Sequence, residues 1–119
     1  MNQLQIAKSF SLGQFTTILD CFSEHIIWEI VGQQRLVGVQ EVTQHCQQIQ
    51  HYFKMTEHHF QILKEVQTGN LCVIQGTAQL ISPDAVTHIS ACDIYTFDSS
   101  NSLIQVESYC MTLPSTVSQ

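Results

Sequence analysis

The chain is 119 residues long, a length that suits a single domain spanning residues 1–119. Only 12% of its residues are charged, which is about half the usual share, while 44% are hydrophobic. Four Lys and Arg side chains oppose ten Asp and Glu, so the net charge is -6. This acidic balance argues against nucleic acid and against anionic membrane surfaces as partners. The low charge content also predicts that part of the surface is hidden in an oligomer interface.

The start of the sequence lacks the pattern of a secretory signal peptide, in which a charged start precedes a long apolar run. No stretch approaches the roughly 18 apolar residues of a membrane-spanning helix. The five cysteines are odd in number and form no C-x-x-C pair. Reduced, mostly buried thiols are therefore expected, and the sequence predicts a cytoplasmic protein.

Three segments have the three-to-four-residue apolar spacing of amphipathic helices. The first two are predicted at 2–10 and 14–22, with a break at Gly13 between them. The clearest one follows Gly38, where a single apolar stripe lies opposite polar glutamines; the stripe consists of Val39, Val42, Cys46, Ile49 and Phe53. Between the second and third helices, a strand is predicted at Ile26–Val31, followed by a turn at Gly32 and a loop up to Gly38.

From Thr56 onward the apolar period changes to two, which is the period of β-strands. Strands are predicted at about 56–67, 71–81, 86–97 and 103–113, and the tail beyond them is expected to fray. Helices followed by a run of strands predict an α+β fold. A strongly curved antiparallel sheet would then wrap around the N-terminal helices as a cone and enclose a pocket for a small apolar molecule.

One face of this predicted sheet is polar but almost uncharged. It carries Gln75, Thr77, Gln79, His88 and Ser90, mixed with Val73, Cys92 and Ile94. A solvated sheet face usually carries Lys and Glu, so this composition favours a homodimer that packs through the outer face of the sheet. The alternative is an ordinary solvated face.

Three stretches carry a resemblance to a known family. They are FSEHIIWEIVG, the step from Gly38 into a helix, and CDIYTFD followed by SLIQVESY. With them the chain resembles the nuclear transport factor 2-like superfamily, in particular its SnoaL-like and ketosteroid-isomerase-like branch. The resemblance covers nearly the whole chain and implies a cone of curved sheet and helices around a pocket, often in a dimer. Many members have Gly-Lys-Ile in the last turn, whereas this chain has Asn101-Ser102-Leu103-Ile104 and lacks the glycine.

The resemblance also implies roles for two acids. Ketosteroid isomerases have a general-base aspartate three residues before the glycine of the first strand's turn, and Glu29 occupies the matching place before Gly32. They have a protonated aspartate on a later strand, and Asp93 matches it ahead of the sequence Ile-Tyr-Thr-Phe-Asp. The family's tyrosine on the first helix has no counterpart, because no tyrosine precedes Tyr52. Steroid isomerisation itself is therefore not expected.

The residues around Asp93 indicate similar chemistry without the family. Strand alternation gives Asp93 a face shared with Ile89, Ala91, Tyr95 and Phe97. Such surroundings are expected to raise its pKa, so that a neutral acid donates a hydrogen bond to a substrate oxygen while Glu29, nearer the mouth, accepts a proton. The alternatives are that Asp93 caps a helix or bonds a backbone amide, and that Glu29 faces water at a sheet edge.

Trp28 and Glu29 are neighbours on one predicted strand, so their side chains point to opposite faces. If Glu29 lines the pocket, Trp28 packs behind the strand. If Trp28 lines the pocket as a ligand contact, Glu29 is displaced from it, unless a bulge intervenes. Glu29 and Asp93 are thus the candidate catalytic residues, and Trp28 is a competing ligand contact.

Four more ligand contacts are predicted: Phe15, Phe53, His59 and Tyr109. Of the adjacent His58 and His59, at most one enters the pocket, and the alternative is a half-exposed histidine at a strand edge. Tyr109 shares a face with Glu107 and lines either the pocket or the dimer interface. No metal is expected, because His and Cys lack zinc-site spacing, and no cofactor is expected, because phosphate and dinucleotide fingerprints are missing.

These features predict a protein that binds a small molecule. If it is an enzyme, the expected reaction is a cofactor-independent proton transfer, such as an isomerisation, cyclisation or dehydration, on an apolar ligand with a polar oxygen. The rival is a non-catalytic module that binds a small molecule or a protein partner. Buried, convergent acids favour the enzyme. A solvent-facing Glu29, or a pocket filled by Phe15, Phe22, Phe53 and Phe60, favours the rival.

Overall fold

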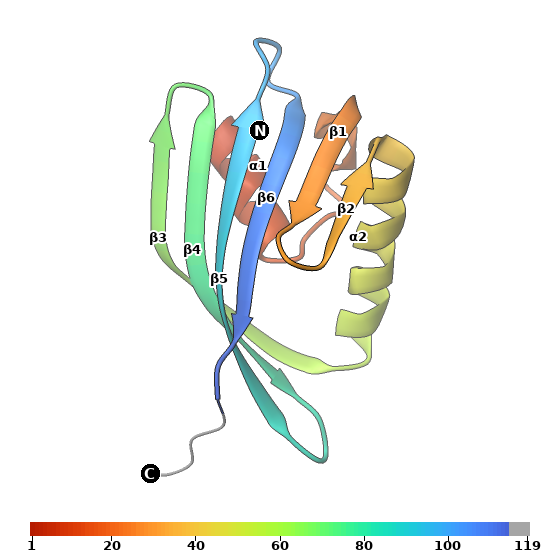
Figure 1. Cartoon of the computed structure of the whole chain (residues 1–119), viewed down its shortest axis with the longest axis vertical. Helices are drawn as coiled ribbons and strands as arrows, with labels where there is room; N and C mark the ends of the chain where they lie inside the picture. Colours follow the sequence, from red (N-terminus) through yellow and green to blue (C-terminus); the bar gives the residue numbers. More distant parts are fainter. Residues whose placement is uncertain (115–119) are drawn as a thin grey trace.

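The computed structural model describes residues 1–114, which form two α-helices, one short 3-10 helix and six strands (Figure 1). The helices are α1 (Gln3–Ser11), η1 (Leu19–Cys21) and α2 (Val39–Lys54). The strands are β1 (Phe22–Ile30), β2 (Gln34–Val37), β3 (Glu57–Thr68), β4 (Leu71–Ile81), β5 (Val86–Phe97) and β6 (Leu103–Thr112). The predicted frayed tail lies, apart from its first residue, outside the described residues.

The six strands form one mixed sheet in the order β2-β1-β6-β5-β4-β3. All neighbouring pairs are antiparallel except β1 and β6, which are parallel. The α+β class is confirmed, but the expectation of a purely antiparallel sheet is wrong, because the last strand of the meander inserts beside β1. The sheet forms one layer, and the helices lie behind it (Figure 1). It lacks the strong curl that the sequence led us to expect.

The segment between α1 and β1 differs from the predicted helix at 14–22. It contains turns and the three-residue η1, and β1 already starts at Phe22. Phe15 and Ile18 are fully buried, so their helix-like spacing reflects core packing in an irregular segment. The β-branched pair Thr16 and Thr17 weakens helix formation between them.

The predicted loop before Gly38 contains the short strand β2, which pairs with β1. The residues of β2 are mostly exposed, so this strand has little of the apolar alternation that identifies a strand in a sequence. Among the described residues, no helix has the length and apolar character needed to cross a membrane.

Both helices cover the same face of the sheet, which we call the inner face. Helix α1 starts with a capping box between Asn2 and Gln5 and buries Ile6, Ala7 and Phe10. Phe10 packs against four aromatic rings, with centroid distances between 4.8 and 5.9 Å; they belong to Phe15, Phe22, Trp28 and Tyr95. This aromatic cluster fixes α1 on the inner face.

The edge strand β3 contains a bulge between Ile62 and Lys64. The facing residue on β4 is Gly76, where a Cβ atom would come within 2.4 Å of the Gln61 carbonyl oxygen. Only glycine accommodates this close approach of two backbones. Beside it lie Ala78 on β4 and Ala91 on β5, which pairs with Gly76. These small residues leave the inner face hollow at this place.

Candidate functional site

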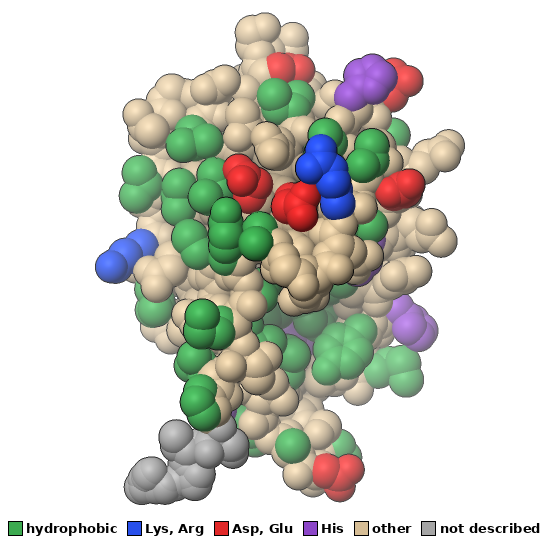
Figure 2. All heavy atoms as spheres, viewed as in Figure 1, with side chains coloured by type: hydrophobic (Ala, Val, Ile, Leu, Met, Phe, Trp, Pro, Cys, Tyr) green, Lys and Arg blue, Asp and Glu red, His purple; other side chains and the backbone are tan. Residues whose placement is uncertain are grey.

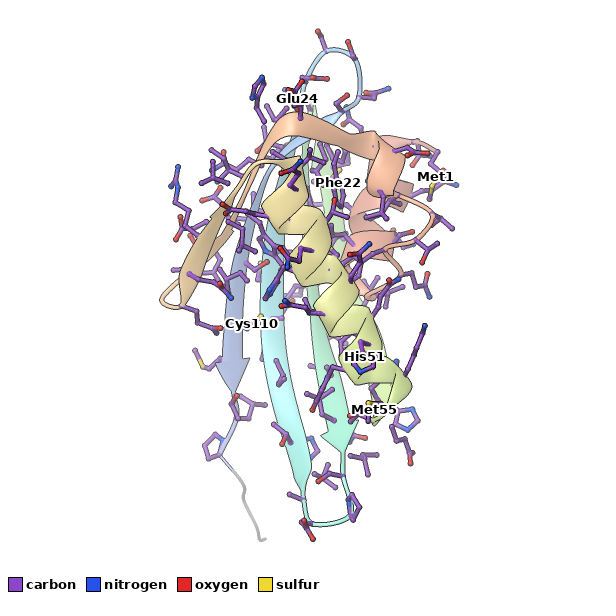
Figure 3. The ribbon with its side chains drawn as sticks, turned by 90° about the vertical axis from the view of Figure 1, so that its right-hand side faces the viewer. Met1, Phe22, Glu24, His51, Met55 and Cys110 are labelled. Carbon is purple, nitrogen blue, oxygen red and sulfur yellow. The ribbon has the colours of Figure 1, made fainter. Side chains whose placement is uncertain are left out.

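A cavity of about 310 Å³ lies between the two helices and the inner face of the sheet. Its lining is mostly apolar and aromatic and includes Phe10, Phe15, Trp28, Ile49, Phe53 and Phe60. Its floor is formed by Gly76, Ala78 and Ala91. Figure 3 shows α2 lying against the inner side of the sheet and Cys110, which also lines the cavity, near the end of β6. The size and lining are typical of a site for a small organic molecule.

Asp93 contributes the only carboxyl group among the residues that line this cavity. Strand alternation places it there together with Ile89 and Ala91, as the sequence predicted. The Ser11 hydroxyl, at the end of α1, donates a hydrogen bond of 2.8 Å to Asp93 Oδ2. Burial raises the pKa of Asp93 above its usual range, against the opposing effect of hydrogen bonds from Ser108, Ser11 and Tyr95. The expected raised pKa thus agrees with the structure in direction.

The polar contacts of Asp93 are hydroxyl groups that belong to a buried network. The Trp28 indole donates from Nε1 to Ser108 Oγ at 2.9 Å, and Ser108 in turn bonds the Asp93 carboxyl. On the other side, the Tyr95 hydroxyl bonds Ser11 Oγ. Burial and the neighbouring Asp93 raise the pKa of Tyr95 well above its usual range, so this phenol remains a donor. The carboxyl group is therefore surrounded by protein groups that can donate to it.

The structure resolves the competition between Trp28 and Glu29. Trp28 is 6% exposed and lines the cavity, whereas Glu29 points to the other face of the sheet. The Glu29 carboxylate bonds Arg35 on β2 at 3.1 Å, and its side chain is 32% exposed. Glu29 and Asp93 are thus not brought together, and the geometry does not support the predicted catalytic pair.

His45 is a cavity residue that the sequence interpretation missed. It lines the cavity from α2 and packs edge-to-face on Trp28, with ring centroids 5.2 Å apart. Burial lowers the pKa of His45, and a hydrogen bond with the Gln48 side chain acts in the opposite direction. The signal was present, because position 45 lies three residues after Val42 and four before Ile49 on the apolar stripe.

Of the other predicted ligand contacts, Phe15 and Phe53 line the cavity. His59 does not: its ring is exposed and lies 3.0 Å from the Glu57 carboxylate. The adjacent His58 instead packs against Phe53 and Phe60, with centroid distances of 4.7 and 5.2 Å.

Tyr109 also lies outside the cavity. It is 47% exposed and pairs with Cys92 on the outer face, because its neighbours Ser108 and Cys110 take the inward positions on β6. Of the two positions left open for each residue, the structure has His59 exposed on the edge strand and Tyr109 on the outer face of the sheet.

The described part of the chain contains no cluster of three or more His, Cys, Asp or Glu side chains arranged to hold a metal ion. All five cysteines are free thiols. Burial raises the pKa of Cys46 to about 12, and burial and Asp93 raise the pKa of Cys110. The thiols at these two positions are therefore protonated near neutral pH.

No family model matches this sequence, and no curated protein matches it. Solved structures do. An NTF2-like protein of unknown function from Cytophaga hutchinsonii is 29% identical, with a TM-score of 0.83 over 90% of this chain and 94% of that one. An LEH-like epoxide hydrolase from M. tuberculosis is 15% identical, with a TM-score of 0.72 over 92% of this chain and 82% of that one. A putative SnoaL-like polyketide cyclase from Shewanella denitrificans is 16% identical, with a TM-score of 0.72 over 92% and 90%.

Proposed function

We propose that this chain, which has the NTF2-like fold, binds a small, mostly apolar molecule through a carbonyl-type oxygen that Asp93 holds in the cavity. The observation that supports this is a single carboxyl group in a cavity lined mostly by apolar and aromatic side chains. A buried acid with a raised pKa keeps its proton more readily than an exposed one. Such a neutral acid recognises an acceptor oxygen.

The hydrogen bonds around Asp93 support a ligand that carries a hydrogen-bond acceptor. Ser108 Oγ already accepts the Trp28 N–H, and Ser11 donates to the carboxyl. Since these protein groups offer hydrogen atoms to Asp93, the proton of the neutral acid is available to a partner in the cavity. A ketone, ester or enone oxygen accepts that proton in a hydrogen bond, whereas an alkane cannot.

The rest of the cavity supports an apolar, flat ligand body. Trp28, Phe15 and Phe53 offer aromatic surface, and the glycine and alanine floor leaves room for a ring. The position of Glu29 outside the cavity removes the base that the resemblance implied. This favours binding as the primary function over proton transfer with Glu29 as the base.

A pair of matched probes tests the proposal. We expect the protein to bind β-tetralone about tenfold more tightly than the hydrocarbon tetralin near pH 5, because only the ketone accepts a hydrogen bond of roughly 1.4 kcal/mol. The preference should decline as pH rises through the raised pKa of Asp93, because the ionised carboxylate has no proton to donate. Titration calorimetry from pH 4.5 to 8.5 measures both effects.

Two substitutions sharpen this test. Asp93→Asn keeps a donor at all pH values, so its preference for the ketone should be independent of pH. Asp93→Leu removes the donor and should bind the two probes equally. Equal binding of ketone and hydrocarbon by the wild-type protein at every pH would refute the role of Asp93. Failure to bind either probe, in a protein shown to be folded, would refute the proposed function for this ligand class.

We also propose that two copies of the chain associate through the outer face of the sheet. In Figure 2, which views this face, hydrophobic side chains spread over strands β3 to β6. Val66, Tyr109 and Met111 on these strands are 54%, 47% and 66% exposed. A second copy would cover this apolar area, and its matching polar residues would pair with glutamine and threonine side chains of the first.

Light scattering coupled to size exclusion tests this association. The wild-type protein should have twice the mass of the 13.5 kDa chain. Tyr109→Asp should weaken the dimer at least tenfold, because it buries a charge in an apolar contact. Met55→Asp is the matched control, because Met55 is also exposed but follows α2 as its C-cap residue in the helical layer. A monomeric wild-type protein at high concentration would contradict the proposal.

A further inference from the structure

We propose that His45 is a general base in the cavity, which removes a proton from the carbon next to the carbonyl group of a bound ketone. The inference rests on the proposed function, since Asp93 must hold the carbonyl oxygen for His45 to reach the adjacent carbon. It assigns proton transfer to a residue of α2, in place of the glutamate on β1 that faces away from the cavity.

His45 and Asp93 line the same cavity from opposite layers, His45 from the helical layer and Asp93 from the sheet. Trp28 connects them. The His45 ring packs edge-to-face on the Trp28 ring, with centroids 5.2 Å apart. The Trp28 indole nitrogen donates to Ser108, which in turn bonds Asp93. In this proposal, a ligand with its oxygen on Asp93 lies along Trp28 and presents its neighbouring carbon to the imidazole.

The protonation states suit these roles. The pKa of His45 is lowered by burial, so the ring is neutral near pH 7 and one nitrogen carries a free electron pair. A hydrogen bond with the Gln48 side chain acts against this lowering of the pKa. Asp93 and Cys110 are the other titratable groups that line the cavity, and both have raised pKa values. The raised pKa values favour the protonated forms of Asp93 and Cys110, whereas the lowered pKa of His45 favours its neutral, proton-accepting form.

The step balances without a cofactor or redox partner. The carbon–hydrogen bond next to the carbonyl breaks, and its proton moves to the His45 nitrogen. The electron pair forms a carbon–carbon double bond, and the carbonyl π electrons move to oxygen, where the Asp93 proton stabilises the enolate. Return of a proton from His45 restores the ketone. In an unsaturated ketone, return to a different carbon moves the double bond.

Exchange of carbon-bound hydrogen with solvent deuterium measures this step directly. We expect the wild-type protein in D₂O to accelerate loss of the α-proton NMR signals of β-tetralone over buffer alone. His45→Gln should reduce the protein-dependent rate by a factor of about 100 or more, the usual contribution of a general base. His45→Gln should change β-tetralone affinity less than threefold. His51→Gln is the matched control, because His51 is exposed on the same helix, and it should exchange like the wild type.

The possible outcomes separate the two proposals. Binding without accelerated exchange overturns the role of His45 and leaves ligand binding intact. Accelerated exchange that survives in His45→Gln also overturns it, because another group must then be the base. Failure of the folded wild-type protein to bind β-tetralone or related ketones overturns the proposed function and this inference together. Exchange that is lost only in His45→Gln, with affinity retained, supports both.

Discussion

Replacing Phe10 with alanine is expected to lower the free energy of unfolding by about 3–5 kcal/mol, the usual range for a buried aromatic side chain. Phe10 is 4% exposed and contacts the rings of Phe15, Phe22, Trp28 and Tyr95. Truncation would remove all four contacts and leave a void between α1 and the sheet. Since small domains are stable by only about 5–15 kcal/mol, urea denaturation followed by tryptophan fluorescence should reveal the loss.

Phe53→Ala is the matched control for this substitution. This substitution removes the same side-chain volume as Phe10→Ala. Phe53, however, lies half-buried at the edge of the cavity, against His58 and Phe60. Its truncation should cost less than half as much as that of Phe10. If the two variants lose equal stability, the aromatic cluster around Phe10 is not the centre of the core.

Replacing Gly76 with alanine is expected to cost about 3 kcal/mol, the upper part of the range for overpacking. The new Cβ atom would lie 2.4 Å from the Gln61 carbonyl oxygen and 3.4 Å from the Ile62 Cα atom. Both belong to the backbone of β3, so no side-chain rotation relieves the contact. The sheet would have to separate at the bulge beneath the cavity. Thermal and urea denaturation measure the loss.

Gly32→Ala serves as the comparison for Gly76→Ala. Gly32 has a φ of +81° in the turn between β1 and β2, and an added Cβ would meet nothing within 4 Å. Its cost comes from backbone conformation alone and should be about 1 kcal/mol. If Gly76→Ala costs no more than Gly32→Ala, the bulge can relax and the floor of the cavity is less constrained than its geometry implies.

The long, periodic elements were the part of the fold that the sequence could predict. The bounds of β4 and β5 agree with the prediction to the residue, and α2 begins where Gly38 indicated. Each has many repeats of one period and a clear turn or glycine at its end. The irregular segment around Phe15 was misread as a helix, because core packing imposed a similar spacing on a chain without helical hydrogen bonds.

The candidate site was predictable in part, because the side chains of a regular strand alternate between its two faces. Alternation separated Trp28 from Glu29, but it could not say which of them faces inward. That choice depends on strand pairing, which brings Ser108 beneath Trp28 and Arg35 beside Glu29. Asp93 was identified because its strand neighbours are apolar. His45 was overlooked although its position on the apolar stripe of α2 indicated an inward-facing side chain, because that position alone does not distinguish a cavity from a filled core.

The parallel pairing of β1 with β6 has a consequence for the order in which the protein folds. The bond between Trp28 and Ser108 joins residues 80 positions apart, and it closes only after β6 has docked. Pairings between such distant segments are slow to form, because the intervening chain must be ordered first. During synthesis on the ribosome, the Trp28 indole N–H lacks its Ser108 partner until nearly the whole chain has emerged. The Asp93 network, which depends on Ser108, is therefore assembled at the end of folding, and we expect no binding activity in a partly made chain.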